Sequence, residues 1–92
     1  MEFEWDEAKN ASNLAKHGVD FLLMTGFDWQ RASFRVDDRR EYGEQRVLGY
    51  GPAGDGQLYV MAFTMRDGRC RIISARRFGR KDSQVYEPPN IG

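Results

Sequence analysis

The side chains of this 92-residue chain that could do chemistry are arginines, lysines, glutamates, tyrosines and one histidine. This inventory suits the cleavage of RNA without a metal ion. That reaction needs a base for the 2′-hydroxyl proton, fixed positive charge at the pentacoordinate phosphorus, and an acid for the leaving 5′-oxygen. Arginine supplies the fixed charge, because its planar fork contacts two phosphate oxygens and stays ionised.

Two residues are candidates for the proton transfer, and each has a plainer alternative. His17 lies at the end of a predicted helix, where an imidazolium also interacts favourably with the helix dipole. Glu44 lies two residues from Arg46 on a predicted strand, so the two point the same way and could form only a surface ion pair. The sequence leaves both residues open as the base.

A predicted hairpin over residues 58–77 carries most of the remaining candidates. Asp67-Gly68 joins two apolar-rich runs, and this dipeptide strongly favours a type I′ turn. Counting outward from the turn places Tyr59 opposite Arg76, with both on the apolar core face. A charge on such a face should reach a partner or a ligand, so Arg76 is a predicted site residue.

The phosphate-binding residues follow from this arrangement. Arg76 and Arg46 are predicted to clamp the scissile phosphate. Four further cations are predicted to bind the phosphates on either side of the scissile one: Lys9, Arg66, Arg71 and Arg77.

The charge distribution supports a basic surface in the second half of the chain. Net charge is zero, yet residues 1–44 hold ten acids and six bases, while residues 45–92 hold eight bases and four acids. Within residues 66–81 there are seven bases against one acid. Such a run is either a solvated face or a phosphate-binding footprint.

Several classes of site have no support in the sequence. No Cys/His cluster predicts structural zinc, and no GxxxxGK loop predicts nucleotide phosphates. Asp37-Asp38 could touch a divalent metal, but adjacent acids in a charged turn are more often solvated. The lone Cys70 falls on the predicted core face as a small buried hydrophobe. We therefore expect no metal and no cofactor.

The predicted elements give an α+β fold. A strand-like lead-in at residues 3–5 precedes a helix capped by Asp6, whose apolar side is formed by Ala8, Ala11, Leu14 and Ala15. A second helix is predicted over residues 21–25, and strands over 46–50 and in the hairpin. Residues 27–34 are predicted to be mainly loop, and residues 37–43 a solvated turn. We expect two N-terminal helices packed on one face of a small, mainly antiparallel sheet.

The chain is short enough for one domain, predicted over residues 1–87, with a mobile tail over residues 88–92. No apolar run spans a bilayer and no signal peptide opens the chain. These observations predict a protein of the bacterial cytoplasm that makes no membrane contact.

Three blocks of sequence, in order, resemble the BrnT family of toxins. The first is Trp5-Asp6-Glu7-x-Lys9-x3-Asn13-x2-Lys16-His17-Gly18-Val19-x-Phe21. The others are Asp38-Arg39-Arg40-x-Tyr42-Gly43-Glu44-x-Arg46 and Arg71-Ile72-Ile73-Ser74-Ala75-Arg76. The resemblance runs from about Phe3 to Arg77.

This resemblance implies a fold similar to RelE-type toxins and a growth-arresting, metal-independent RNA cleavage. It also implies a BrnA-type antitoxin with a ribbon-helix-helix DNA-binding part, so that DNA is contacted only through the antitoxin in a complex that represses its own promoter. From the residues alone, two other functions stay open. One is a non-catalytic RNA-binding module, and the other is a protein-interaction domain that uses the arginine-rich sheet face.

Overall fold

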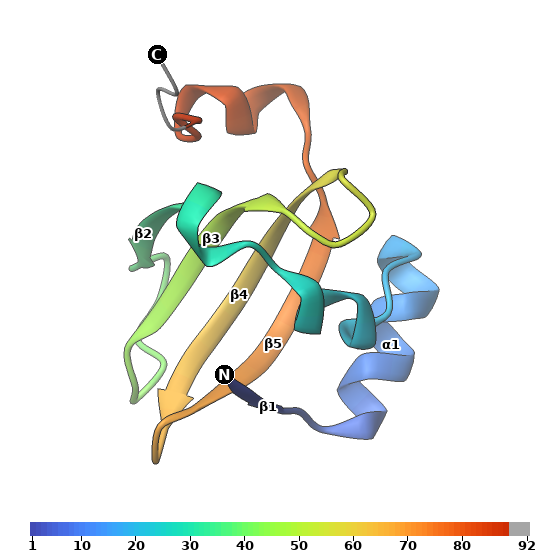
Figure 1. Ribbon diagram of the computed structural model, residues 1–92. Coiled ribbons are helices and arrows are strands. Elements are labelled where there is room, and N and C mark those ends of the chain that lie inside the picture. The colour runs from blue at the N-terminus through green and yellow to red at the C-terminus, as the bar shows by residue number, and fades with distance from the viewer. Residues whose placement is uncertain (89–92) are drawn as a thin grey trace.

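The computed structural model describes residues 1–88, whose main element is a five-stranded sheet in the order β1-β5-β4-β3-β2 (Figure 1). The strands are β1 (Glu2–Glu4), β2 (Ser33–Asp37), β3 (Arg46–Pro52), β4 (Leu58–Arg66) and β5 (Arg69–Arg77). The helices are α1 (Glu7–His17) and the 3-10 helices η1 (Phe21–Gly26), η2 (Trp29–Arg31) and η3 (Arg80–Gln84).

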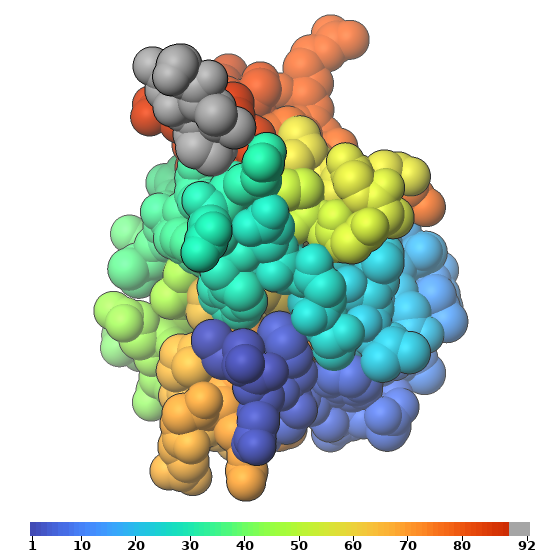
Figure 2. Space-filling view, viewed as in Figure 1, coloured from blue at the N-terminus to red at the C-terminus, as the bar shows by residue number. Residues whose placement is uncertain are grey.

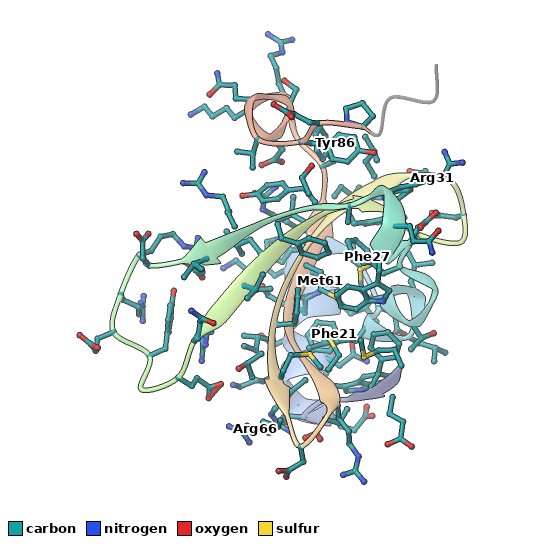
Figure 3. The ribbon with its side chains drawn as sticks, turned by 60° about the vertical axis from the view of Figure 1, so that its left-hand side comes forward. Phe21, Phe27, Arg31, Met61, Arg66 and Tyr86 are labelled. Carbon is teal, nitrogen blue, oxygen red and sulfur yellow. The ribbon has the colours of Figure 1, made fainter. Side chains whose placement is uncertain are left out.

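The hydrophobic core lies on one face of this sheet. The space-filling view shows residues 19–32, in cyan to teal, lying over that face (Figure 2). Phe21 and Phe27 point towards Met61 of β4 on the same side of the sheet (Figure 3). The strands contribute these buried core residues: Tyr59, Met61, Phe63, Cys70, Ile72 and Ala75. As expected, Cys70 is a buried thiol, and burial raises its pKa to about 12.

The predicted packing of two helices on an antiparallel sheet is wrong. Within residues 1–88, α1 is the one α-helix, and the predicted second helix is the 3-10 helix η1. The Asp20 side chain does cap it, accepting a hydrogen bond from the Leu22 backbone N–H at 2.9 Å. Six residues ending at a glycine leave little room for α-helical bonds, so the tighter 3-10 turn forms. The sheet is mixed, because β1 pairs in parallel with β5.

Helix α1 lies beside the edge of β5 and presents a polar residue to it. Asn13 is buried, whereas Leu14 is 46% exposed. The other residues of the predicted apolar side are also exposed. The Asn13 Nδ2 donates to the carbonyls of Ala75 (2.8 Å) and Val19 (2.9 Å), and its Oδ1 accepts from the Ala75 N–H (3.1 Å). One side-chain amide thus pairs both backbone groups of Ala75, as a neighbouring strand would.

The hairpin of β4 and β5 follows the predicted register only as far as a β-bulge. Asp67 (φ 50°) and Gly68 (φ 78°) form the predicted turn, and Phe63 pairs with Ile72 as expected. Ala62 then pairs with Ser74, because Ile73 is the extra residue of the bulge. The predicted pairing of Tyr59 with Arg76 is therefore wrong, since Val60 faces Arg76. The bulge moves Arg76 to the face opposite the core.

Strand β2 spans the gap between the segment predicted to be mainly loop, which ends at residue 34, and the predicted turn, which begins at residue 37, and it forms the edge of the sheet beyond β3. The predicted lead-in strand is β1. No helix among the described residues is long and apolar enough to cross a membrane. The single-domain assignment stays a prediction. The predicted tail falls almost wholly on residues 89–92, which lie outside the described residues.

The Asn13 contacts predict a large and local effect on stability. Asn13→Ala should lower the free energy of unfolding by about 2–4 kcal/mol, because it leaves the buried N–H and C=O of Ala75 without partners. Urea unfolding measures the change. Ser12→Ala, on the exposed side of the same helix, should stay within about 0.5 kcal/mol of the parent. Equal losses in the two variants would contradict this role of Asn13.

Candidate functional site

The face of the sheet opposite the core bears a groove with an apolar floor and cationic walls. Leu48, Val60 and Ala62 form the floor. The walls of this cationic groove are Lys16, His17, Arg39, Arg40, Tyr42, Arg46, Ser74 and Arg76. Two adjoining cavities make it up, one of about 240 Å³ beside His17 and Arg76 and one of about 510 Å³ beside Tyr42 and Arg46.

The end of helix α1 supplies Lys16 and His17 to the groove. Gly18 ends the helix in the left-handed region (φ 71°), and its N–H donates to the Leu14 carbonyl at 2.8 Å. This ending suits glycine, because a side chain at such a φ is strained. His17 is half-buried and lines the smaller cavity together with Ser74 and Arg76.

Arg76 is held by a carboxylate from the C-terminal part of the chain. Its Nη1 and Nη2 donate to Asp82 Oδ2 (2.8 Å) and Oδ1 (3.0 Å). Asp82, in η3, is buried and also accepts from the Gly79 N–H at 2.7 Å. The Arg76 hydrogen bonds hold the pKa of Asp82 below its usual value, and Asp82 in turn raises the pKa of Arg76. The charge of Arg76 is therefore fixed in place before any ligand arrives.

This pairing leaves one edge of the Arg76 guanidinium unused by Asp82. The carboxylate takes the end of the fork, formed by Nη1 and Nη2. The side edge, formed by Nε–H and the second Nη2 hydrogen, can still contact two oxygens of a phosphate. The Arg76 side chain is 44% exposed, so solvent or a ligand reaches it.

A second buried carboxylate orders the other end of the groove. Asp37 lies at the end of β2 with a side chain only 1% exposed. Arg39 donates to it through Nε (2.7 Å) and Nη2 (2.8 Å), and the Tyr42 hydroxyl donates at 3.1 Å. Hydrogen bonding from Arg39 lowers the pKa of Asp37 to about 2, so this carboxylate is ionised at neutral pH.

Arg46 packs against this cluster and carries an unpaired donor. Its guanidinium carbon lies 4.0 Å from the centre of the Tyr42 ring, a cation–π contact. Its Nε is buried and has no hydrogen-bond partner among the residues that the structure describes. A buried donor without a partner is costly, so this atom adds no stability to the position of Arg46 beyond the contact with Tyr42.

The groove brings together three of the four predicted catalytic residues. His17 and Arg76 line one cavity, and Arg46 lines the adjoining one. Glu44 lines a neighbouring cavity within residues 36–45, which shares Arg40 and Tyr42 with the groove, and it accepts a hydrogen bond from Arg66 at 3.1 Å. That bond lowers the pKa of Glu44.

The four predicted RNA-binding residues lie outside the groove. Arg66 lies near the hairpin turn (Figure 3) and is paired with Glu44. Arg71 pairs with Glu4 at 2.7 Å, and Arg77 donates to Gln57 at 3.2 Å. Lys9 is exposed on α1, two turns before Lys16 and on the same side of the helix.

The sequence analysis missed most of the groove walls and both buried carboxylates. These residues are Lys16, Asp37, Arg39, Arg40, Tyr42, Ser74 and Asp82. All of them except Asp37 and Asp82 lie within the three sequence blocks that resemble the family. Membership of a block could therefore have marked them as candidate site residues. Nothing in the sequence marks Asp82, because its pairing with Arg76 depends on how the chain turns after β5.

A small protein whose described residues form one α-helix, a five-stranded sheet and such a groove suits a ligand that carries several phosphates. The chain belongs to the BrnT family, because the family model described as "Ribonuclease toxin, BrnT, of type II toxin-antitoxin system" matches residues 5–82. The sequence-based identification is thereby confirmed. Membership implies an RNA substrate and an antitoxin partner.

Among solved structures, the crystal structure of the Brucella abortus ribonuclease toxin BrnT is similar to this chain. The TM-score is 0.58 at 22% identity, over 87% of this chain and 99% of that one. At this identity the likeness shows a shared fold. No curated protein matches the chain.

The Asp37 cluster predicts a dependence of stability on pH. Since the pKa of Asp37 is lowered to about 2, the ionised carboxylate stabilises the fold above its unfolded pKa of about 4, and this stabilisation is lost as the pH falls towards 2. Asp37→Asn should cost on the order of 1 kcal/mol at neutral pH, because Arg39 is largely exposed to solvent.

Urea unfolding between about pH 7 and pH 3 tests this, and the difference between parent and variant should shrink at the acid end. Asp38→Asn removes an equal charge from the exposed neighbouring residue and should change stability by less than about 0.5 kcal/mol. A difference that stays constant with pH would argue against an ionised Asp37 as the cause.

Proposed function

We propose that this chain is an endoribonuclease that cuts RNA without a metal ion, by attack of a 2′-hydroxyl on the adjacent phosphate. The observation that carries the proposal is the cationic groove, in which His17 and Arg76 share one cavity. The products would be a 2′,3′-cyclic phosphate and a 5′-hydroxyl. All the chemistry in this proposal comes from side chains of the groove.

Arg76 and Arg46 hold the scissile phosphate and the phosphate beside it. Arg76 contacts the first through the free side edge of its guanidinium. Arg46 lines the adjoining cavity, and its guanidinium supplies positive charge to the second phosphate. Fixed donors of this kind favour the extra negative charge of the transition state, because they need no rearrangement as that charge forms.

The proton is moved by His17 rather than Glu44. The imidazole lies in the cavity with Arg76 and can accept the 2′-hydroxyl proton. The Lys16 ammonium shares this cavity and can donate to the leaving 5′-oxygen. Glu44 does not line the cavity of His17 and Arg76 and is paired with Arg66, so we propose a structural role for it.

We further propose that the partner is a BrnA-type antitoxin with a ribbon-helix-helix DNA-binding part, and that the pair represses its own promoter. The toxin would contact DNA only through the antitoxin. It would act in the bacterial cytoplasm as a single domain over residues 1–87. Family membership supports these statements.

The first test is incubation of the purified protein with labelled RNA in excess EDTA. Arg76→Ala and His17→Asn should each lower the cleavage rate at least about 100-fold, as expected for loss of a charge-stabilising or proton-transferring group. Arg80→Ala, which removes an exposed charge of η3, should stay within about threefold of the parent.

Loss of parent cleavage in EDTA would overturn metal independence, and full activity of both site variants would overturn the assigned site. RNA binding that weakens steeply with salt, without any cut, would instead identify a non-catalytic RNA-binding module.

The ion pair of Arg76 with Asp82 predicts a loss in turnover with little loss in binding. Asp82→Asn keeps an acceptor for the Gly79 N–H but loosens Arg76, so kcat should fall about tenfold while KM changes less than about threefold. Steady-state cleavage of a fluorescent oligoribonucleotide separates the two. Glu87→Gln, an equal charge change at an exposed position, is the control. Equal kcat in Asp82→Asn and the control would show that Asp82 does not position Arg76.

A further inference from the structure

Among residues 1–88, no strand covers the outer edge of β2, and only the Ser33 side chain at its start is bonded to the backbone of Glu87. In the described sheet, β2 pairs with β3 on one side and has no strand on the other (Figure 1). An edge strand leaves a row of backbone N–H and C=O groups available for pairing with another extended segment. Proteins normally protect such an edge with proline, a bulge, charged side chains or a covering segment. The two charged residues of β2, Arg35 and Asp37, both lie on its groove face. Strand β2 contains no proline and pairs with β3 without a register shift.

The two faces of this edge differ sharply in chemistry. On the core side, Phe34 and Val36 are 45% and 52% exposed, beyond the cover that η1 and η2 give to the rest of that face. Phe34 stacks on Trp29, with 5.8 Å between the ring centres, so it is held in place while exposed. On the groove side, Arg35 lines a cavity of about 210 Å³ that also reaches Tyr50 and Arg76.

This pattern disfavours one pairing of a second copy of the chain at this edge, the register centred on Arg35. Two β2 strands paired antiparallel about Arg35 would match Phe34 with Val36, as an apolar contact requires. The same register places Arg35 directly opposite its own copy, and like charges in that position are destabilising. An acidic residue opposite Arg35 would reverse the sign of this interaction.

We propose that the β2 edge binds an extended segment of the antitoxin as a sixth strand. Its alternate apolar side chains would pack on Phe34 and Val36, and an acidic residue between them would face Arg35. Backbone hydrogen bonds give such a complex its affinity, and the alternating side chains give its specificity. The inference rests on the toxin–antitoxin function and adds the place where the partner docks.

An antitoxin strand bound at the β2 edge would also affect the groove. Because Arg35 and Arg76 line one cavity, an acidic side chain that faces Arg35 enters it from the strand edge. The antitoxin would then place negative charge where we propose that the RNA phosphate binds.

The test measures binding of the antitoxin encoded by the neighbouring gene to the full chain, by isothermal titration. Val36→Lys should weaken binding at least about 30-fold, because a charge enters the apolar side of the added strand. The matched control is Leu14→Lys, the same kind of change at a residue of similar exposure on α1, beyond the opposite edge of the sheet. It should change binding less than about threefold.

Amide hydrogen exchange of the complex gives a second readout, with new protection expected within residues 33–37. Unchanged binding by Val36→Lys, or protection confined to α1 with loss of binding in Leu14→Lys, would overturn the proposal. So would a dimer of the free chain that Val36→Lys dissociates, since a second copy would then occupy the edge.

Cleavage of RNA by free Val36→Lys should match that of the parent. A parent chain that binds the antitoxin through β2 but cuts no RNA would reject the proposed nuclease and leave this docking site standing.

Discussion

The candidate site depends on one extra residue in β5. In a regular strand, Arg76 would follow Ile72 on the core face and lie beside Tyr59 and Met61, where an arginine is costly to bury. The bulge at Ile73 reverses the alternation, so that Ala75 fills the core and Arg76 joins the groove. The same shift lets the backbone of Ala75 meet Asn13 of α1. Core packing, helix docking and the position of the main cation thus follow from a single irregularity.

Two kinds of ion pair explain how a chain without net charge has a cationic groove. Near the hairpin turn, Arg66, Arg69 and Arg71 each pair with a glutamate, so their charges are largely neutralised within the protein. In the groove, the paired acids Asp37 and Asp82 are buried beneath the arginines that they hold. Their carboxylates fix the orientation of Arg39 and Arg76 while the outer edges of the guanidinium groups still face solvent. The distribution of acids matters more here than their number.

The sequence predicted those features that depend on neighbouring residues, and it missed those that depend on distant ones. The Asp67-Gly68 turn, the strands beside it, the Asp6 cap of α1 and the family were all predicted from local signals. The bulge was not, because no residue type marks Ile73 as unpaired. The buried side of helix α1 was predicted wrongly. An asparagine, Asn13, faces β5 there, whereas apolar side chains usually face the sheet. The pairing of Arg66 and Arg71 with Glu44 and Glu4 depends on strand order, which the sequence does not display.

The contact of Asn13 with Ala75 has a mechanical consequence for the site. His17 lies one helical turn after Asn13, and Arg76 directly follows Ala75, so each site residue is adjacent to one end of the same buried hydrogen-bonded joint. Helix and strand therefore move as one body at the point where His17 and Arg76 approach each other. Residues 38–45 and 53–57 make no contribution to the hydrogen bonds of this joint. The joint thus ties the spacing of His17 and Arg76 to the helix and the strand rather than to the connecting loops.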